Sequence, residues 1–398
     1  MPELETIYRE DSVLYLLDRD PIASKASFCV THPGQLADEE GVHWLNTNAL
    51  KSVLLPEREK ALISAGRARA INRSHPAAKE LLENGRKSGG KRRVNILALG
   101  DVGATLLLGL KLLGGDVVSE IGIYDARDTF AARYEQEMNQ IALPMAYDAM
   151  PEVVAIEKSQ LFECDVFVFC ASAGVPTVGA AVADVRMAQL HSNMGILKEY
   201  ARMARNERFK GLFAVVSDPV DLLCRYAYLE SNRNETGKLD YLGLLAEQIR
   251  GYGLGVMNAR AAYYAKKEAR YSSFLSEGRA YGPHGKDLII ANSIAQYDEA
   301  LSLELTKMAM EANLQMRALG FKPYIAPALS SGALSILLTL RGEWHYSAIS
   351  LGGVYFGCRN RKTLFGLETE ALPLSGVLYE RLRLTYQTLK LQQQETME

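Results

Sequence analysis

The sequence lacks the features that mark several protein classes. Its five cysteines are scattered without a Cys-x-x-Cys pair, which favours reduced thiols over a disulfide framework or a metal site. No apolar run reaches the roughly 18 residues that a membrane-spanning helix needs. The first residues include acids and no apolar segment of a secretory signal. We therefore expect a cytoplasmic protein without a membrane partner.

The chain also lacks an excess of charge of either sign. Its formal net charge is −2 over 398 residues, so nothing in the overall balance attracts nucleic acid. A basic, glycine-rich stretch at residues 85–93 could contact nucleic acid. It is short and has no interleaved aromatic residues, which favours a solvated linker. A length of 398 residues allows two or three domains.

Short apolar segments alternate with helical ones after residue 90. The expected strands are residues 94–99, 121–124, 165–171 and 212–217, and helical segments such as residues 104–113 and 196–205 separate them. This alternation predicts an α/β fold with a Rossmann-type, doubly wound parallel sheet. The second half mixes helices at residues 298–319 and 375–391 with less regular segments, as in an α+β domain.

The expected organisation has three parts. Residues 1–90 form an N-terminal extension, which contains a possible strand at residues 12–17 and a capped helix start at residues 74–82. Residues 91–250 form a dinucleotide-binding Rossmann domain, and residues 251–398 form a mixed α+β substrate domain. The sequence gives no role for the extension, which could extend a subunit interface or cover a face of the nucleotide domain.

A glycine-containing turn follows the first apolar strand. It reads Ala98-Leu99-Gly100-Asp101-Val102-Gly103, with Ala98 in place of the first glycine of the G-x-G-x-x-G fingerprint. Gly100 would let the backbone approach a pyrophosphate, and Gly103 would let the helix pack close to the strand. By itself the motif could equally be a tight turn of an α/β sheet. The next strand ends at Asp125, a possible acceptor for a ribose hydroxyl, which favours NAD, while Arg127 keeps NADP open.

Two side chains are candidates for chemistry on a small acid. His284 stands between glycines in Gly282-Pro283-His284-Gly285, a turn that can project an imidazole into a cleft. Arg260 follows the glycine-rich turn Gly251-Tyr252-Gly253-Leu254-Gly255 and could face the same cleft from a helix. Read in isolation, the histidine is more often structural and the arginine more often part of a surface salt bridge.

Several ordered segments give a resemblance to the lactate/malate dehydrogenase family from about residue 94 to the C-terminus. Besides the glycine turn, these are Ala173-Gly174-Val175-Pro176, Ser217-Asp218-Pro219-Val220-Asp221, residues 251–260 and Gly282-Pro283-His284-Gly285-Lys286-Asp287. The resemblance implies NAD as cofactor and a small carboxylate as substrate. It also implies a homo-oligomer, either a dimer or a tetramer. The cofactor-binding residues expected on this basis are Gly100, Asp101, Val102, Gly103, Asp125, Ala171 and Gly174.

The resemblance also implies catalytic roles. His284 would exchange a proton with the keto oxygen, and Arg260 would hold the substrate carboxylate. Arg186 lies seven residues before Asn193, the family's spacing for an arginine on a mobile loop that polarises the carbonyl.

The chain departs from the family pattern at two positions near these groups. Met257 stands where the family has the aspartate that pairs with the histidine, and Asp218 stands where it has an asparagine. Three explanations remain open. Asp218 has taken over the pairing with His284, the substrate tolerates a nearby negative charge, or the site has lost its chemistry.

The expected mobile loop also differs, because Thr177 follows Pro176 where malate enzymes of the family place an arginine. Residues 177–185 are largely apolar, so we expect an uncharged substrate side chain and poor use of oxaloacetate. The sequence thus predicts an NAD-dependent 2-hydroxyacid dehydrogenase with Asp218 included in its catalytic set. The alternative is a catalytically impaired nucleotide-binding relative that senses or regulates.

Overall fold

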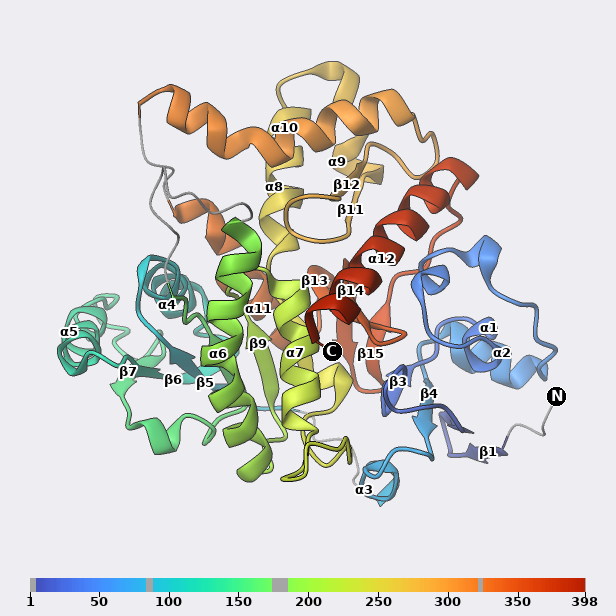
Figure 1. Cartoon of the computed structure of the whole chain (residues 1–398), viewed down its shortest axis with the longest axis horizontal. Coiled ribbons are helices and arrows are strands. Elements are labelled where there is room, and N and C mark those ends of the chain that lie inside the picture. The colour runs from blue at the N-terminus through green and yellow to red at the C-terminus, as the bar shows by residue number, and fades with distance from the viewer. Residues whose placement is uncertain (1–4, 84–88, 174–184, 321–324, 398) are drawn as a thin grey trace.

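The computed structural model describes residues 5–83, 89–173, 185–320 and 325–397. Its centre is a nine-stranded sheet in the order β15-β14-β13-β10-β9-β8-β5-β6-β7 (Figure 1). The strands are β5 (Arg92–Leu97), β6 (Val118–Tyr124), β7 (Glu152–Ala155), β8 (Val166–Phe169), β9 (Leu212–Val215), β10 (Ile249–Gly251), β13 (His345–Leu351), β14 (Val354–Thr363) and β15 (Gly366–Thr369).

The run from β10 to β7 is parallel, and β13 to β15 continue it in antiparallel fashion. Numbered along the chain, the parallel strands have the order 3-2-1-4-5-6 of a dinucleotide-binding sheet, with its switch point between β5 and β8. Ligands of such sheets bind outside the carboxyl ends of the strands at this point. The predicted fold class is therefore confirmed.

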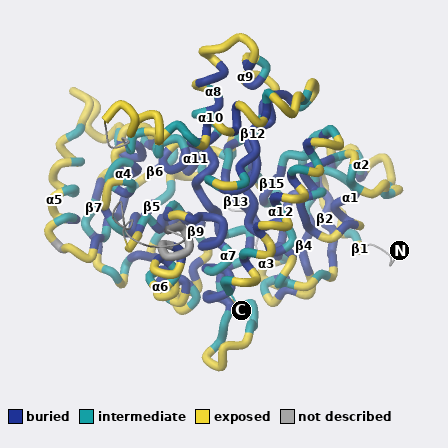
Figure 2. Tube along the Cα trace, turned by 45° about the horizontal axis from the view of Figure 1, so that its top comes forward, coloured by how far each residue is buried: buried dark blue, intermediate teal, exposed yellow. Residues whose placement is uncertain are grey.

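Both faces of the parallel sheet are covered by apolar cores. Successive residues of a strand point to opposite faces, so each strand contributes side chains to both cores. In β8, Phe167 and Phe169 belong to one apolar core, and Val166 and Val168 belong to another. The first core includes side chains of α6 (Val185–Asn206), α7 (Val220–Ser231) and α12 (Gly376–Met397). The second includes α4 (Asp101–Leu113) and α11 (Ala333–Arg341). The buried strands run through the middle of the molecule in Figure 2.

A third apolar core lies where α8 (Leu254–Ala265) packs against α10 (Glu299–Ala318) and the two-stranded sheet of β11 (Arg279–Tyr281) and β12 (Ile289–Ala291). These elements project from the central sheet in Figure 1. The predicted division between residues 250 and 251 falls inside β10, which is hydrogen-bonded to neighbours on both sides. The division into these domains stays a prediction.

The N-terminal residues fold as a small sheet of their own. Its strands have the order β1-β2-β4-β3 and enclose a core around Trp44 and Tyr15. The elements of this part are β1 (Glu5–Tyr8), β2 (Val13–Leu17), β3 (Ser27–Cys29), α1 (Gly34–Ala37), α2 (Glu57–Ser64), β4 (Ala68–Asn72) and α3 (Ala78–Glu83). The helix expected from residue 74 thus begins later, at Ala78. The remaining α-helices of the described residues are α5 (Asp128–Asn139) and α9 (Phe274–Glu277), and short 3₁₀ helices occur at Val42–Leu45, Thr47–Ala49, Lys158–Gln160, Ala246–Gln248, Ala269–Tyr271 and Ala326–Ser330.

The N-terminal sheet is fixed to the rest of the chain by buried polar contacts. β3 lies against β15, the outermost strand of the central sheet. The carboxylate of Glu247 accepts hydrogen bonds from the backbone N–H groups of Ala26, at 3.1 Å, and Ser27, at 2.8 Å. Lys25 forms a fully buried ion pair with Glu40 and donates to the carbonyl oxygen of Ser350 at 2.9 Å. Within the described residues, no helix is long and apolar enough to cross a membrane.

Breaking the buried pair should destabilise the chain far more than breaking an exposed one. The Lys25→Met substitution leaves the carboxylate of Glu40 buried without its cation, so we expect unfolding free energy to fall by about 3–5 kcal/mol. Lys60 pairs with Glu57 on the surface, and Lys60→Met should change it by about 1 kcal/mol or less. Urea denaturation measures both. Equal losses in the two variants would show that the buried pair does not hold the N-terminal sheet in place.

Candidate active site

The glycine turn follows β5 at the switch point of the sheet. Ala98 has a φ of 72°, the left-handed conformation that glycine adopts more readily. A side chain at Gly103 would place its Cβ 2.0 Å from the carbonyl oxygen of Ala98, so the helix can lie this close only with glycine there. A Cβ at Gly100 would meet nothing within 4 Å. The start of α4 at Asp101 therefore has open space beside its first turn, as an approaching pyrophosphate requires.

Asp125 lies after β6, beside this turn, and is 5% exposed. Its Oδ2 accepts from the N–H of Leu99 at 2.7 Å and from the guanidinium of Arg127 at 3.1 Å, and its Oδ1 accepts from the Nε of Arg127 at 2.8 Å and its N–H at 3.0 Å. Burial alone would raise the pKa of Asp125, but these hydrogen bonds hold it below its ordinary value. All four usual acceptor positions of the carboxylate are engaged.

Buried hydrogen bonds join the carboxyl ends of β8 and β9. The hydroxyl of Ser217 donates to the carbonyl oxygen of Ala171 at 2.7 Å. The fully buried amide of Asn193 accepts from the N–H of Ala173 at 3.0 Å and donates to the carbonyl oxygen of Asp218 at 2.8 Å. Asn193 therefore holds the backbone that carries Asp218. In the sequence, Asn193 marks only the spacing to Arg186, and its buried hydrogen bonds arise from the fold.

His284 and Asp218 meet at this edge. The Nδ1 of His284 lies 2.9 Å from the Oδ1 of Asp218, and the two side chains are 24% and 48% exposed. The flanking Gly282 and Gly285 have φ values of 85° and 127°, which favour glycine in the turn that carries the ring. A Cβ at Gly253 would lie 2.8 Å from the Cβ of His284, so this glycine makes room for the histidine.

The charges around His284 favour its protonated form. The negative charge of Asp218 raises the pKa of His284 above its ordinary value, against the opposing effects of burial and of Arg260. Asp221, which is 2% exposed on α7, raises this pKa as well. Because a carboxylate faces Nδ1, that nitrogen carries a proton in either charge state and the tautomer is fixed. The ring is thus arranged for proton transfer through its other nitrogen.

Arg260 lies on α8, close enough to His284 for its charge to act on the ring. Its guanidinium donates to Asn313 Oδ1 at 2.7 Å and to the carbonyl oxygen of Ala309 at 3.3 Å, both on α10. It also lies 3.6 Å from the sulfur of Met257, which is buried in the core beneath. A guanidinium has five N–H donors, so contacts with α10 leave donors for an anion.

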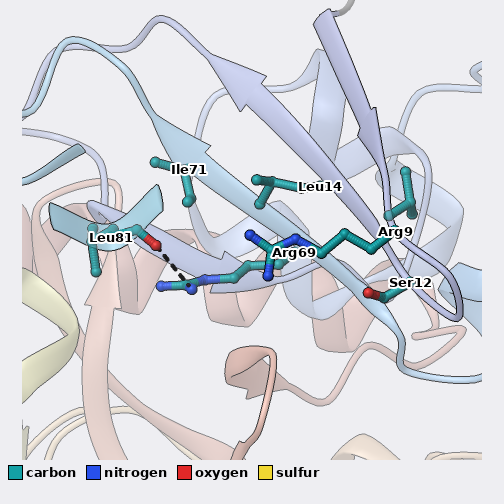
Figure 3. A pocket seen from close by; sticks show the side chains of 7 residues that line it. Arg9, Ser12, Leu14, Arg69, Ile71 and Leu81 are labelled. Atoms are coloured by element: carbon teal, nitrogen blue, oxygen red, sulfur yellow. Dashed lines mark hydrogen bonds between the residues drawn. The ribbon is translucent and has the colours of Figure 1, made fainter. Parts of the chain in front are cut away.

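The structure thus brings together His284, Asp218 and Arg260 from three distant segments, and it places the glycine turn and Ala171 on the neighbouring strand ends. Arg186 lies in the first turn of α6, but its side chain is outside the described residues, as is Gly174. A small pocket lined by Arg9 and Arg69 (Figure 3) belongs to the N-terminal sheet and shares no residue with this group.

Comparisons with known proteins find malate and lactate dehydrogenases among the relatives of this chain. No protein-family model matches the chain. It is 25% identical over 218 residues to malate dehydrogenase of Sulfurimonas denitrificans, which covers 54% of this chain and 61% of that protein. It is 22% identical over 290 residues to L-lactate dehydrogenase of Mesomycoplasma hyopneumoniae, covering 65% and 85%.

Solved structures share the fold. Malate dehydrogenase from Archaeoglobus fulgidus in complex with NADH aligns with a TM-score of 0.61 at 19% identity, over 77% of this chain and 100% of that one. The minor L-lactate dehydrogenase from Enterococcus mundtii aligns with a TM-score of 0.61 at 18% identity, over 77% and 99%.

The raised pKa of His284 can be measured without turnover. We expect a proton NMR titration of the histidine rings to place it above the ordinary value of about 6.5. Asp218→Asn removes the main negative charge and should lower it. Asp287→Asn removes a charge from the same loop that is not among the main causes of the raised pKa, and should change the titration of His284 much less. A titration of His284 that stays the same in Asp218→Asn would contradict the pairing.

Proposed function

We propose that this chain, a divergent member of the lactate/malate dehydrogenase family, is an NAD-dependent oxidoreductase that interconverts a small 2-hydroxy acid and its 2-keto acid. The observation that carries the proposal is the hydrogen bond between His284 and Asp218, with Arg260 nearby, at the carboxyl edge of a dinucleotide-type sheet. An imidazole oriented by a carboxylate is a proton donor and acceptor, and a guanidinium is a carboxylate holder.

The chain's own residues fit a dinucleotide at the switch point. The open space at Gly100 and the close approach at Gly103 suit a pyrophosphate beside the first turn of α4, with Asp101 and Val102 in that turn. Asp125 would accept from the ribose in place of the Arg127 guanidinium, which occupies two of its acceptor positions. Ala171, which follows β8, would contact the cofactor, and the same role for Gly174 stays a prediction from the sequence. When bound, the dinucleotide supplies or accepts the hydride.

Proton transfer falls to His284. During reduction it would give a proton to the keto oxygen, and during oxidation it would take the proton back from the hydroxyl. Arg260 would hold the substrate carboxylate through paired hydrogen bonds and so fix its orientation. Arg186, from the start of α6, would polarise the carbonyl once water is excluded.

Asp218 is the member of the site that differs from the family pattern. Its 2.9 Å contact with His284 supports the explanation that the aspartate partner has moved from position 257 to position 218. Met257 cannot replace it, because a thioether is only a weak acceptor and stabilises no imidazolium. Asp218 would set the ring tautomer and stabilise the protonated ring. Its negative charge near the substrate is balanced by the protonated histidine.

The substrate side chain stays a prediction from the sequence. The apolar segment at residues 177–185, which favours an uncharged side chain, falls mostly outside the described residues and has no described side chains. A dimer or tetramer and a cytoplasmic location are likewise proposals. The alternative, a nucleotide-binding sensor, shares cofactor binding with the enzyme and differs in turnover.

Turnover of NADH with a panel of 2-keto acids tests the proposal. We expect small uncharged keto acids to be reduced and oxaloacetate to be a poor substrate. His284→Gln should lower kcat by about 10²–10⁴ through loss of the proton donor. Asp218→Asn should lower it by up to about 10⁴ and shift the loss of activity at high pH to lower pH, because the histidine loses its proton sooner.

Asp287→Asn serves as the charge-matched control and should retain activity. A wild-type chain that binds NADH but reduces none of the acids would favour the sensor. A His284→Gln variant with full turnover would exclude the assigned proton donor. Restoration of the family pattern, by Asp218→Asn with Met257→Asp, should not raise turnover if the pairing has moved.

Arg127 should raise the KM for NADH. It occupies acceptor positions of Asp125 that a ribose hydroxyl would need, and its own side chain is 54% exposed. We expect Arg127→Gln to lower the KM for NADH by roughly two- to five-fold, as expected for release of an exposed ion pair. Arg133→Gln, which breaks a neighbouring pair with Glu137, should have no such effect. A higher KM for NADH in Arg127→Gln would argue against Asp125 as the ribose acceptor.

A further inference from the structure

The guanidinium of Arg260 is held by neutral groups. One terminal nitrogen donates to the carbonyl oxygen of Ala309 at 3.3 Å and lies 3.6 Å from the sulfur of Met257, and the other donates to Asn313 Oδ1 at 2.7 Å. Among the described residues, no carboxylate forms an ion pair with Arg260. Because an arginine stays charged in proteins, its positive charge is left for an anion to offset.

Two side-chain hydrogen bonds join α8 to α10, which pack against each other (Figure 1). Arg260 and Tyr264 are one helical turn apart on α8, so they lie on the same face of that helix. Arg260 donates to Asn313, and the hydroxyl of Tyr264 donates to Gln315 Oε1 at 2.9 Å. Only the first of these two bonds involves the residue that would hold the substrate carboxylate.

The part of α10 that precedes Asn313 is firmly attached to its neighbours. The hydroxyl of the buried Ser302 donates to the carbonyl oxygen of Ile290 in β12 at 2.6 Å, and Thr306 Oγ1 accepts from the N–H of Ile290 at 2.9 Å. Ala309 is fully buried in the core that α10 shares with α8. The oxygens that hold the guanidinium therefore belong to a helix whose position is fixed by other contacts.

Asparagine is an unfavourable residue for position 313 in terms of local stability. Asn313 is exposed and lies in the interior of α10, where asparagine stabilises a helix less than alanine does, because its side chain competes for backbone hydrogen bonds. A residue that weakens its own helix is expected at functional positions, where another contact explains it. For Asn313 that contact is the hydrogen bond to Arg260.

The amide at position 313 also leaves the charge of Arg260 available. An amide oxygen accepts a hydrogen bond without neutralising the guanidinium, whereas a carboxylate at the same place would form an ion pair with it. Each terminal nitrogen of the guanidinium carries two N–H groups, so the bonds to Ala309 and Asn313 leave donors on both nitrogens. The arrangement thus orients the guanidinium and keeps it able to bind an anion.

We propose that Asn313 is a positioning residue, which orients Arg260 for the substrate carboxylate and leaves its charge uncompensated. This inference rests on the proposed function, in which Arg260 holds that carboxylate. Asn313 acts through Arg260 and takes no part in the transfer of the hydride or the proton. A change at position 313 should therefore raise KM more than it lowers kcat.

Binding and turnover of pyruvate, 2-oxobutanoate and phenylpyruvate in the presence of NADH test this role. Asn313→Ala should raise the KM and the calorimetric Kd by about three- to tenfold, because the guanidinium loses a bond that fixes its orientation. Its Tm should stay the same or rise, since alanine is the better helix former. Asn313→Asp should raise the KM and Kd by roughly tenfold or more, because the new carboxylate competes with the substrate for Arg260.

Gln315→Ala is the matched control, because it removes the neighbouring hydrogen bond between α8 and α10 without touching Arg260. Its KM and Kd should stay near those of the wild type. Equal effects of Gln315→Ala and Asn313→Ala would overturn the proposal, since they would reflect only the packing of the two helices. An unchanged Kd in Asn313→Ala would also overturn it, as would a Kd in Asn313→Asp no larger than that in Asn313→Ala.

Binding measured without turnover separates this inference from the proposed function. A wild type that binds a keto acid but does not reduce it would contradict the proposed function, and the expected order of Kd values among the variants would still support the role of Asn313. A wild type that reduces the acid, with the same Kd in all variants, would contradict only the role of Asn313. A wild type that binds none of the three acids would overturn both.

Discussion

The hydrogen bond between His284 and Asp218 joins two parts of the chain that the rest of the structure holds in place. On one side, Ser217 and Asn193 fix the carboxyl ends of β8 and β9, and Asn193 holds the carbonyl of Asp218 itself. On the other side, Gly253 leaves the space that the ring of His284 occupies. The contact is possible because the parallel strands place these segments along one edge of the sheet. The sheet therefore fixes the positions of the residues that form the candidate site.

The buried charges of Lys25 and Arg250 differ in whether an opposite charge lies beside them. In the N-terminal part, Lys25 and Glu40 form a buried ion pair in which each charge is the partner of the other, and Lys25 also donates to Ser350 of the central sheet. Arg250 has no such partner among the described residues. Its strand, β10, continues through Tyr252 into α8, which carries Arg260.

Local patterns in the sequence predicted the apolar strands well, and the structure has β5, β6, β8 and β9 at those positions. Other strands were missed for reasons visible in their residues. β10 has three residues, and Arg250 interrupts its apolar character. β13 and β14 contain His345 and Asn360, which are buried and lie opposite each other in the two strands. Such polar residues interrupt the apolar pattern by which a buried strand is recognised in a sequence. In these strands, tertiary contacts outweigh the local propensity of the sequence.

The sequence by itself determined the fold class and the order of the functional segments, because strand patterns and glycine turns are local properties of the chain. Only the tertiary structure decided which groups meet. It paired His284 with Asp218 across 66 residues of sequence, filled the acceptors of Asp125 with Arg127, and buried Arg250 without a carboxylate. Such pairings depend on the direction and distance of side chains after folding, and spacing along a chain carries neither.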